Sequence, residues 1–196
     1  DKTVPTGKVE FVDRAAWEEF VNTITFGLFY KDEVTVQVTA NDILSGVEKI
    51  EYASADEAMA LDEVKEITHW NEYTESFGVA LEDAKKFVYF IRITDKAGNV
   101  TYLSTDGAEY DTTAPVISGV ENGKTYYTTQ KVTVTDKNIE SITLNGEAVG
   151  EVITLDGNKK ATYTVEATDK AGNTATVTVT MKQISDLSQP IDALNK

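Results

Sequence analysis

The sequence contains no cysteine and only one histidine among its 196 residues. Disulfide bonds and thiolate metal sites are therefore impossible, and the side chain used most often for proton transfer is almost missing. Glycine-rich phosphate loops and the Gly-x-Ser-x-Gly nucleophile motif are also absent. Aspartate and glutamate are so abundant that no pair of them stands out as an acid and a base. These features argue against an enzyme, and we expect no cofactor.

Basic residues and long apolar runs are scarce as well. Lysine and arginine number 18 against 33 aspartates and glutamates, which gives a formal net charge of −15. Nucleic acids and anionic membrane surfaces require basic patches, so neither is expected as a partner. No apolar run approaches the roughly 18–20 residues that cross a membrane, and we expect no membrane insertion. We interpret the acidity as an aid to solubility and expect a monomer.

Only three prolines are present, and two of them mark a repeated junction. Asp1-Lys2-Thr3-Val4-Pro5 recurs as Asp111-Thr112-Thr113-Ala114-Pro115. Proline fixes φ and cannot donate a hydrogen bond to a sheet, which suits a short connection between domains. We therefore expect a leading linker at residues 1–9, a first domain at 10–112, a smaller second domain at 113–182, and an outgoing linker or the start of a further module at 183–196.

The last of these segments and the ends of the chain carry two further expectations. Ile184, Leu187, Ile191 and Leu194 have rough helical spacing, which Pro190 interrupts, so they resemble the first turn of a following module. The sequence shows neither a signal peptide nor a sorting signal, and we expect it to be part of a longer precursor.

One six-residue stretch, Thr-Asp-Lys-Ala-Gly-Asn, occurs twice, at residues 94–99 and 168–173. Each copy lies between two runs of alternating apolar residues, which predicts a tight reversal between antiparallel strands. Glycine supplies the positive φ that such a turn needs, and Asp and Asn side chains bond back to the local backbone. The predicted turn residues are Asp95, Gly98, Asn99, Asp169, Gly172 and Asn173.

The repeat extends upstream of the turn. Residues 87–93 align without a gap on residues 161–167, and both segments place a tyrosine and then aliphatic or alanine residues at every second position. A period of two indicates one buried strand face. Phe90 is apolar where the second copy has Thr164. The strand of the first copy is therefore expected to be buried on both faces, and the strand of the second copy to be exposed to solvent on its outer face.

A strand of this form, with its Asp-x-Ala-Gly-Asn turn and a threonine-rich strand after it, resembles the bacterial immunoglobulin-like (Big-type) modules. These modules occur in tandem in surface and secreted proteins, mostly of Gram-positive bacteria. Because both copies match, the resemblance covers most of the chain. It implies an all-β protein made of two tandem immunoglobulin-like β-sandwiches. Freedom from cysteine suits this class, whereas extracellular immunoglobulin domains of animals usually carry an inter-sheet disulfide.

Short helical insertions are expected in the first domain. Asp13 is a suitable N-cap for a short helix at residues 13–21. Its Trp17, Phe20 and Val21 have the spacing of one helical face, which Ile24 continues. Ser54 and Glu57 form a possible capping box for a second helical turn, and residues 61–65 form a third. In the second domain Asn145-Gly146 and Asp156-Gly157 predict hairpins.

The aromatic segment at residues 69–73 is the first candidate site. His69, Trp70 and Tyr73 lie close together in a stretch read as a strand, in which neighbouring side chains point to opposite faces. Exposed aromatic rings could stack on a sugar, which makes carbohydrate or a host surface protein the alternative partner. The interpretation that we favour places Trp70 in the core and His69 on the surface.

Oxygen-rich turns are the second candidate. Asp42, Asp95 and Asp169 lie in turns whose oxygens suit calcium, but turn capping already accounts for them and no twelve-residue calcium loop exists. A lysine–asparagine amide crosslink would need a marked pair, and no sequence feature selects one for Lys131 or Lys159.

The function expected is a non-catalytic spacer or stalk in a bacterial surface or secreted protein. Its expected partners are neighbouring modules of the same polypeptide. The alternative is an adhesin-type binding module, supported only by the aromatic segment.

Overall fold

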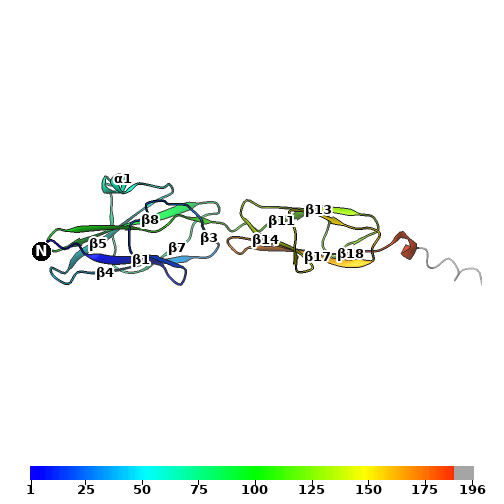
Figure 1. The fold of residues 1–196 in the computed structure, drawn as a ribbon, viewed down its shortest axis with the longest axis horizontal. Coiled ribbons are helices and arrows are strands. Elements are labelled where there is room, and N and C mark those ends of the chain that lie inside the picture. The colour runs from blue at the N-terminus through cyan, green and yellow to red at the C-terminus, as the bar shows by residue number, and fades with distance from the viewer. Residues whose placement is uncertain (188–196) are drawn as a thin grey trace, which may run out of the picture. The chain divides into compact units, whose positions relative to one another are not determined.

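The computed structural model describes residues 1–187, which form an all-β protein with one short α-helix and a single 3-10 turn in that range (Figure 1). The chain divides into two compact units, unit 1 (Asp1–Thr112) and unit 2 (Thr113–Lys196). Neither helical element of the described residues is long enough to cross a bilayer.

Unit 1 contains ten strands in two sheets. They are β1 (Thr6–Phe11), β2 (Ala15–Trp17), β3 (Leu28–Tyr30), β4 (Val34–Asn41), β5 (Val47–Ala55), β6 (Asn71–Glu72), β7 (Phe77–Val79), β8 (Lys86–Asp95), β9 (Val100–Ser104) and β10 (Ala108–Tyr110). One sheet has the order β2-β1-β4-β7 and the other the order β3-β10-β8-β5-β6, with β9 also paired to β8.

The inner faces of these two sheets share one hydrophobic core. Strands β1 and β4 contribute Val9, Phe11 and Val36 from one sheet, and β8 contributes Ile91 and Ile93 from the other, all with no exposed surface. Their spacing of two residues follows from the alternation of side chains along a strand. Unit 1 is therefore held together by burial between two sheets.

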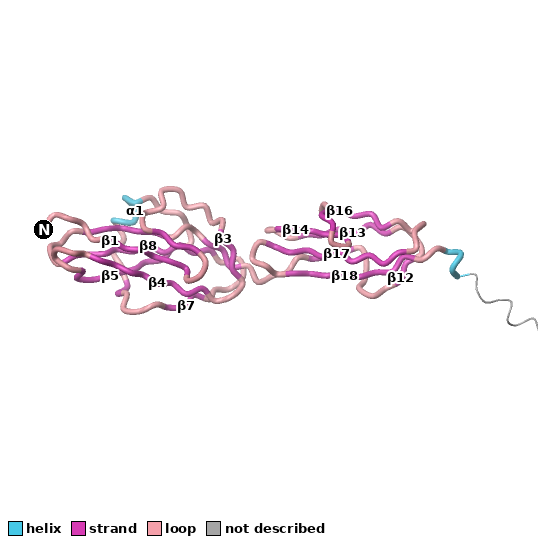
Figure 2. The backbone as a smooth tube through the Cα atoms, turned by 60° about the horizontal axis from the view of Figure 1, so that its bottom comes forward, coloured by secondary structure: helices cyan, strands magenta, loops and turns pink. Residues whose placement is uncertain are grey.

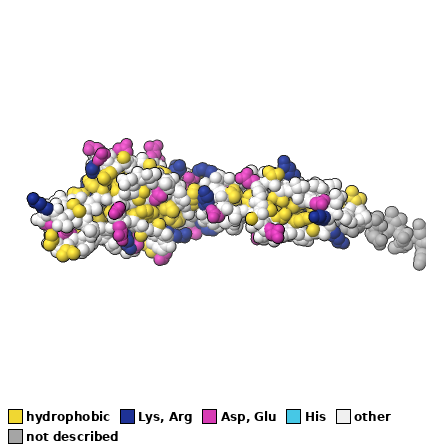
Figure 3. Space-filling model, viewed as in Figure 1, with side chains coloured by type: hydrophobic (Ala, Val, Ile, Leu, Met, Phe, Trp, Pro, Cys, Tyr) yellow, Lys and Arg dark blue, Asp and Glu magenta, His cyan; other side chains and the backbone are white. Residues whose placement is uncertain are grey.

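A second layer covers the outer face of β8. Helix α1 (Leu61–Lys65) lies on this side of the unit (Figures 1 and 2), and its Val64 packs against Val88 and Phe90 in a separate hydrophobic cluster. The ring of Phe20 stacks on that of Phe90 with 6.2 Å between centroids. Acidic side chains gather on the solvent side above α1 (Figure 3). The outer cluster is thus apolar inside and acidic outside.

Unit 2 is built on the same plan with fewer strands. These are β11 (Val116–Ser118), β12 (Thr125–Tyr126), β13 (Gln130–Thr135), β14 (Ile139–Leu144), β15 (Glu147–Ala148), β16 (Val152–Leu155), β17 (Ala161–Asp169) and β18 (Thr174–Met181). The sheet orders are β11-β13-β16 and β12-β18-β17-β14-β15. Val132 and Leu155 of the first sheet pack with Val165 and Val179 of the second.

The two repeated strands differ as the sequence predicts. Residues 87–91 of β8 are buried without interruption, because the sheet core takes one face and the α1 cluster the other. In β17, buried Val165 and Ala167 alternate with the exposed or half-buried outward residues Thr164 and Glu166. The threonine-rich outer face of unit 2 is accordingly open to water.

Three local predictions from the sequence are wrong. Residues 13–21 form no helix, because Ala15–Trp17 pairs with β1 as a strand and Trp17 packs edge-on against Phe11 at 5.2 Å. No helix begins at Ser54, since β5 continues to Ala55. The Asp156-Gly157 pair joins strands β16 and β17 of different sheets, so it forms no hairpin.

Other local predictions have mixed outcomes. The Asn145-Gly146 pair does close the β14–β15 hairpin, and both residues have positive φ (51° and 84°). The predicted turn at 61–65 is helix α1, whose N-cap is Ala60, and the Ala60 N–H donates to Glu63 Oε2 at 2.7 Å. Ile184–Leu187 is a 3-10 turn, whereas Pro190, Ile191 and Leu194 lie outside the described residues.

The double coverage of β8 can be tested with a matched pair of substitutions. Phe90→Ala removes a fully buried ring and should lower the free energy of unfolding by about 3–5 kcal/mol. Thr164→Ala, at the aligned position of β17, loses a hydroxyl contact with Thr178 and should cost less than about 1 kcal/mol. Urea unfolding followed by tryptophan fluorescence reports unit 1, which holds both tryptophans, and circular dichroism reports the whole chain. Equal costs at the two positions would contradict the covered face.

Candidate functional site

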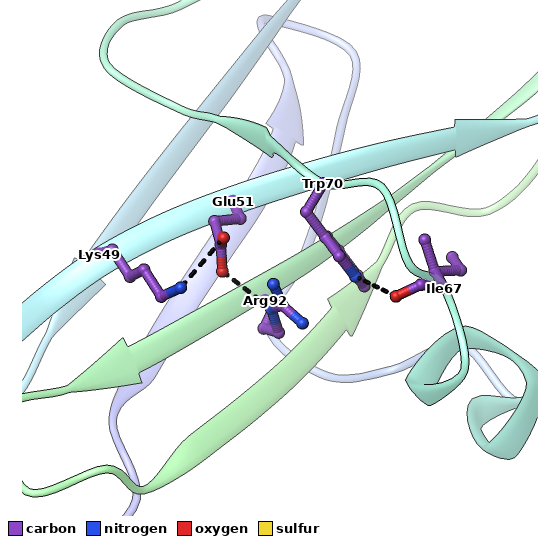
Figure 4. Close-up of polar contacts among 5 residues, drawn as sticks. All are labelled: Lys49, Glu51, Ile67, Trp70 and Arg92. Carbon is purple, nitrogen blue, oxygen red and sulfur yellow. Dashed lines mark hydrogen bonds and ion pairs between the residues drawn. The ribbon is translucent and has the colours of Figure 1, made fainter.

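Trp70 lies at the border of the outer cluster of unit 1, half-buried and fixed on two sides. Its Nε1–H donates to the Ile67 carbonyl at 2.9 Å, and the guanidinium carbon of Arg92 lies 4.5 Å from the centre of a ring of the indole (Figure 4). The ring of Tyr102 is 6.2 Å away. The indole is therefore held by backbone and by a cation, which stabilises its orientation.

Arg92 belongs to a row of polar side chains across the outer face of the sheet. Its Nε donates to Glu51 Oε2 at 2.8 Å, and Lys49 Nζ donates to Glu51 Oε1 at 3.1 Å (Figure 4). Strand register places Arg92 directly between Glu51 of β5 and Tyr102 of β9. The row combines an aromatic ring, a fork-shaped cation and a carboxylate on neighbouring strands.

The charges in this row stabilise one another. Burial by itself would raise the pKa of the Glu51 carboxyl, but hydrogen bonds from Arg92 and Lys49 hold the pKa below its usual value. The hydrogen bond to Glu51 in turn raises the pKa of the Arg92 guanidinium. Both groups are therefore charged at neutral pH, and the row holds a fixed charge pattern.

The structure does not bring the three predicted aromatic-segment residues together. His69 is exposed, and its Nδ1 lies 2.9 Å from the Thr68 hydroxyl. Tyr73 reaches the opposite side of the sheet, where its hydroxyl accepts the Val38 N–H at 2.9 Å and its ring joins the inner core. The strand predicted through residues 69–73 is also wrong. Residues 67–70 form a loop, and only Asn71–Glu72 pairs with β5.

Sequence reasoning missed Arg92, Glu51 and Tyr102. These three residues occupy outward positions on three strands. The one signal in the sequence was Arg92 itself, a charged residue two places after Phe90 in a largely apolar strand. The pairing that unites them is decided by register between strands far apart in the sequence. Aromatic and guanidinium groups together can contact sugar rings and carboxylates, which gives this face of unit 1 its binding chemistry.

The repeated turns are closed by their aspartates. Asp95 is fully buried, and its Oδ1 accepts the Ala97 and Asn99 N–H groups at 2.9 and 2.8 Å. Its Oδ2 accepts Asn99 Nδ2 at 2.7 Å. Asp169 accepts the Asn173 N–H and Nδ2 in the same way, each at 2.8 Å. In each copy the N–H donors thus replace the water that the buried carboxylate has lost.

Carboxylates also meet beside the first turn. Asp1, Asp42 and Asp95 each place an oxygen within 4.8 Å of the others. Asp42 Oδ1 already accepts the N–H groups of Ser45 and Gly46, both at 2.7 Å. The three oxygens are hard ligands that calcium uses, yet such an ion takes six to eight oxygens. Asp42 and Asp95 therefore lie together, and Asp169 lies in the corresponding turn of unit 2.

No protein-family model matches the sequence. A stretch of 70 residues is 39% identical to an outer cell wall protein of Brevibacillus brevis (strain 47 / JCM 6285 / NBRC 100599), and the match covers 34% of this chain. The chain spans only 7% of the length of that relative.

Several solved structures align with most of this chain at low sequence identity. Fibronectin(III)-like modules of Clostridium thermocellum CbhA have a TM-score of 0.36 at 11% identity, and the match covers 89% of this chain and 94% of theirs. Bacteroides ovatus SGBP-B, solved with a mixed-linkage heptasaccharide, has a TM-score of 0.32 at 13% identity over 87% of this chain and 47% of its own. Domains FN1–FN3 of chicken CNTN1 have a TM-score of 0.28 at 11% identity over 84% and 68%. With TM-scores below 0.5, none of them carries an argument for function.

The buried turn aspartate predicts a pH dependence of stability. Burial alone would raise the pKa of Asp95, but hydrogen bonds from Asn99, Ser45 and Ala97 lower it below the usual value. A lowered folded-state pKa adds stability above the unfolded value of about 3.9, and this stability is lost as the pH falls through the folded-state pKa. The wild type should therefore exceed Asp95→Asn in stability at pH 6, with a gap that narrows below about pH 4.

The measurement is the urea midpoint of unit 1, followed by tryptophan fluorescence at pH values from 6 to 2. Asp62→Asn is the control, because the Asp62 side chain is 93% exposed and its ion pair with Lys65 contributes little. A gap between wild type and Asp95→Asn that does not change with pH would show that the carboxylate charge is not the stabilising feature.

Proposed function

We propose that the chain is a pair of immunoglobulin-like β-sandwich modules that act as a non-catalytic spacer in a bacterial cell-surface or secreted multidomain protein. The observation that carries the proposal is that one building plan is used twice. Each unit has two sheets around its own core, and each has a buried aspartate closing the turn between two consecutive antiparallel strands, β8–β9 in unit 1 and β17–β18 in unit 2. The proposed boundary lies at residues 112 and 113.

The cell-surface location is supported by the Brevibacillus outer cell wall protein, with which the chain shares 39% identity over 70 residues. The composition agrees, because a cysteine-free, acidic chain suits a soluble module outside a Gram-positive cell. The neighbouring modules of the same polypeptide are the partners that a spacer requires.

The non-catalytic character is supported by where the perturbed acids lie. The pKa of Glu51 and that of Asp95 are both lowered, as hydrogen-bonded structural carboxylates require. Glu51 is paired with Arg92 on the sheet face, whereas Asp95 is enclosed in its turn, so the two do not converge on a common pocket. A catalytic acid–base pair would need two titratable groups whose pKa values are shifted in opposite directions and that face one substrate.

A binding function is the second candidate, and the outer face around Trp70 favours it. Trp70, Tyr102 and Arg92 present rings and a guanidinium on one surface, next to Lys49 and Glu51. The ligand classes that fit this chemistry are carbohydrates and acidic segments of a host protein. The indole N–H of Trp70 is already bonded to the Ile67 carbonyl, so it is not free to donate to a ligand. The spacer is therefore the better-supported function.

A screen of the chain against a glycan array and host-matrix proteins separates the two functions. The spacer predicts no binding above background, with or without calcium. Binding that is lost in Trp70→Ala and kept in His69→Ala would instead assign the second function to this face. His69→Ala is the matched control because it removes an exposed ring from the same segment. Circular dichroism must show that both variants keep their sheets.

A further inference from the structure

The segment at residues 1–5 is held by the repeated turn, by strand β9 and by the loop that contains Ser45. Asn99 Nδ2 donates to the Thr3 carbonyl at 3.1 Å, and the Thr101 hydroxyl donates to the Pro5 carbonyl at 2.5 Å. The Ser45 hydroxyl donates to Asp1 Oδ2 at 2.9 Å. Pro5 is buried although Thr3 and Val4 are exposed. At Thr3 and Pro5 the segment is therefore held through its backbone carbonyls, whereas Asp1 is held through its side chain.

Asn99 is suited to this contact because its two amide hydrogens have separate acceptors. The carboxamide nitrogen carries two donors. One bonds to Asp95 Oδ2 within the turn, and the other reaches the Thr3 carbonyl. The turn is itself tied to the adjacent loop, since the Lys96 N–H donates to the Gly46 carbonyl at 3.0 Å. The bond to Asp95 within the turn thus holds the Asn99 carboxamide in one orientation, independently of its bond to Thr3.

Unit 2 repeats the turn and its tie to the adjacent loop. Asn173 Nδ2 bonds to Asp169 Oδ2 at 2.8 Å, and Gly172 has a φ of 85° against 86° for Gly98. The Lys170 N–H donates to the Asn138 carbonyl at 2.8 Å, as Lys96 does to Gly46. In the sequence, Thr113 precedes Pro115 by two positions, just as Thr3 precedes Pro5. Thr113 is therefore the counterpart of Thr3.

We propose that the Asp-Lys-Ala-Gly-Asn turn is a linker clamp, in which Asn173 of unit 2 holds the Thr113 carbonyl as Asn99 of unit 1 holds that of Thr3. The aspartate orients the asparagine, and the asparagine holds the peptide that leads into the module. The partner of this surface is the backbone of the junction segment, so the contact does not depend on the side chain that follows the threonine, which is Val4 in the first copy and Ala114 in the second. This inference is independent of the spacer function.

One difference between the units supplies a gain-of-function test. Thr101, which bonds to the Pro5 carbonyl, aligns with Ala175 two residues after the second turn asparagine. Alanine has no hydroxyl, so the second clamp lacks this bond to Pro115. Ala175→Thr would give unit 2 the chemistry of unit 1, and Thr101→Ala would give unit 1 the chemistry of unit 2.

The experiment measures backbone ¹⁵N relaxation in the full chain. Residues 113 and 114 should have order parameters near about 0.85 in the wild type, falling below about 0.6 in Asn173→Ala. Thr112 should change little, because its N–H and hydroxyl donate to Asp83. Asn99→Ala is the matched control: it should mobilise residues 2–4 and leave residues 113 and 114 unchanged. Unaltered amide shifts of Lys170 and Gly172 show that the turn survives in Asn173→Ala.

Ala175→Thr keeps the test decisive if Asn173→Ala disturbs its turn. It should slow hydrogen exchange of the Thr113 and Ala114 amides, and Thr101→Ala should speed exchange at Thr3 and Val4. Two results would overturn the clamp. One is equal order parameters at residues 113 and 114 in the wild type and in an Asn173→Ala variant with an intact turn. The other is low order parameters there in the wild type.

Discussion

The buried carboxylate of the repeated turn is the interaction on which the rest of each unit depends. A charge without exposed surface is stable only if hydrogen bonds replace its water, and Asp95 obtains three of them from Ala97 and Asn99. These bonds can form only when the turn has its observed geometry, with Gly98 at positive φ. The geometry of the turn sets the register of β8 and β9, and register decides which side chains enter the core.

The same frame supports two different outer faces. In unit 1, apolar Phe90 and Val88 on the outer side of β8 demand a cover, and α1 with Phe20 supplies it. In unit 2, threonines on the outer side of β17 and β18 need none, because their hydroxyls face water. Trp70 lies at the edge of this outer cluster, where the covered part of the sheet ends and the polar row of Arg92 and Glu51 begins. The surface proposed for the second candidate function lies at this border.

That border shows how a structural role and a binding role compete for the same groups. Arg92 stacks on Trp70 and pairs with Glu51, so the cation stabilises both the indole and the carboxylate. A ligand would have to compete with contacts that are already made inside the protein. The turns, in contrast, use their asparagines for the adjoining peptide, as Asn99 does for Thr3. Of the two surfaces, the turns are the better suited to contacts within the chain, which agrees with a modular spacer.

The sequence alone was enough for features that depend on neighbours along the chain. Period-two alternation predicted the buried faces of β8 and β17, because neighbouring side chains of a strand point to opposite faces. The Asp, Gly and Asn spacing predicted both turns, because each turn is closed by bonds within six residues. Features that depend on distant partners were not accessible. Trp17 has helical spacing with Phe20, yet pairing with β1 makes it part of a strand. Whether Trp70 contacts Arg92 was decided only by the register of β5, β8 and β9, since cross-strand neighbours are selected by the packing of the whole sheet.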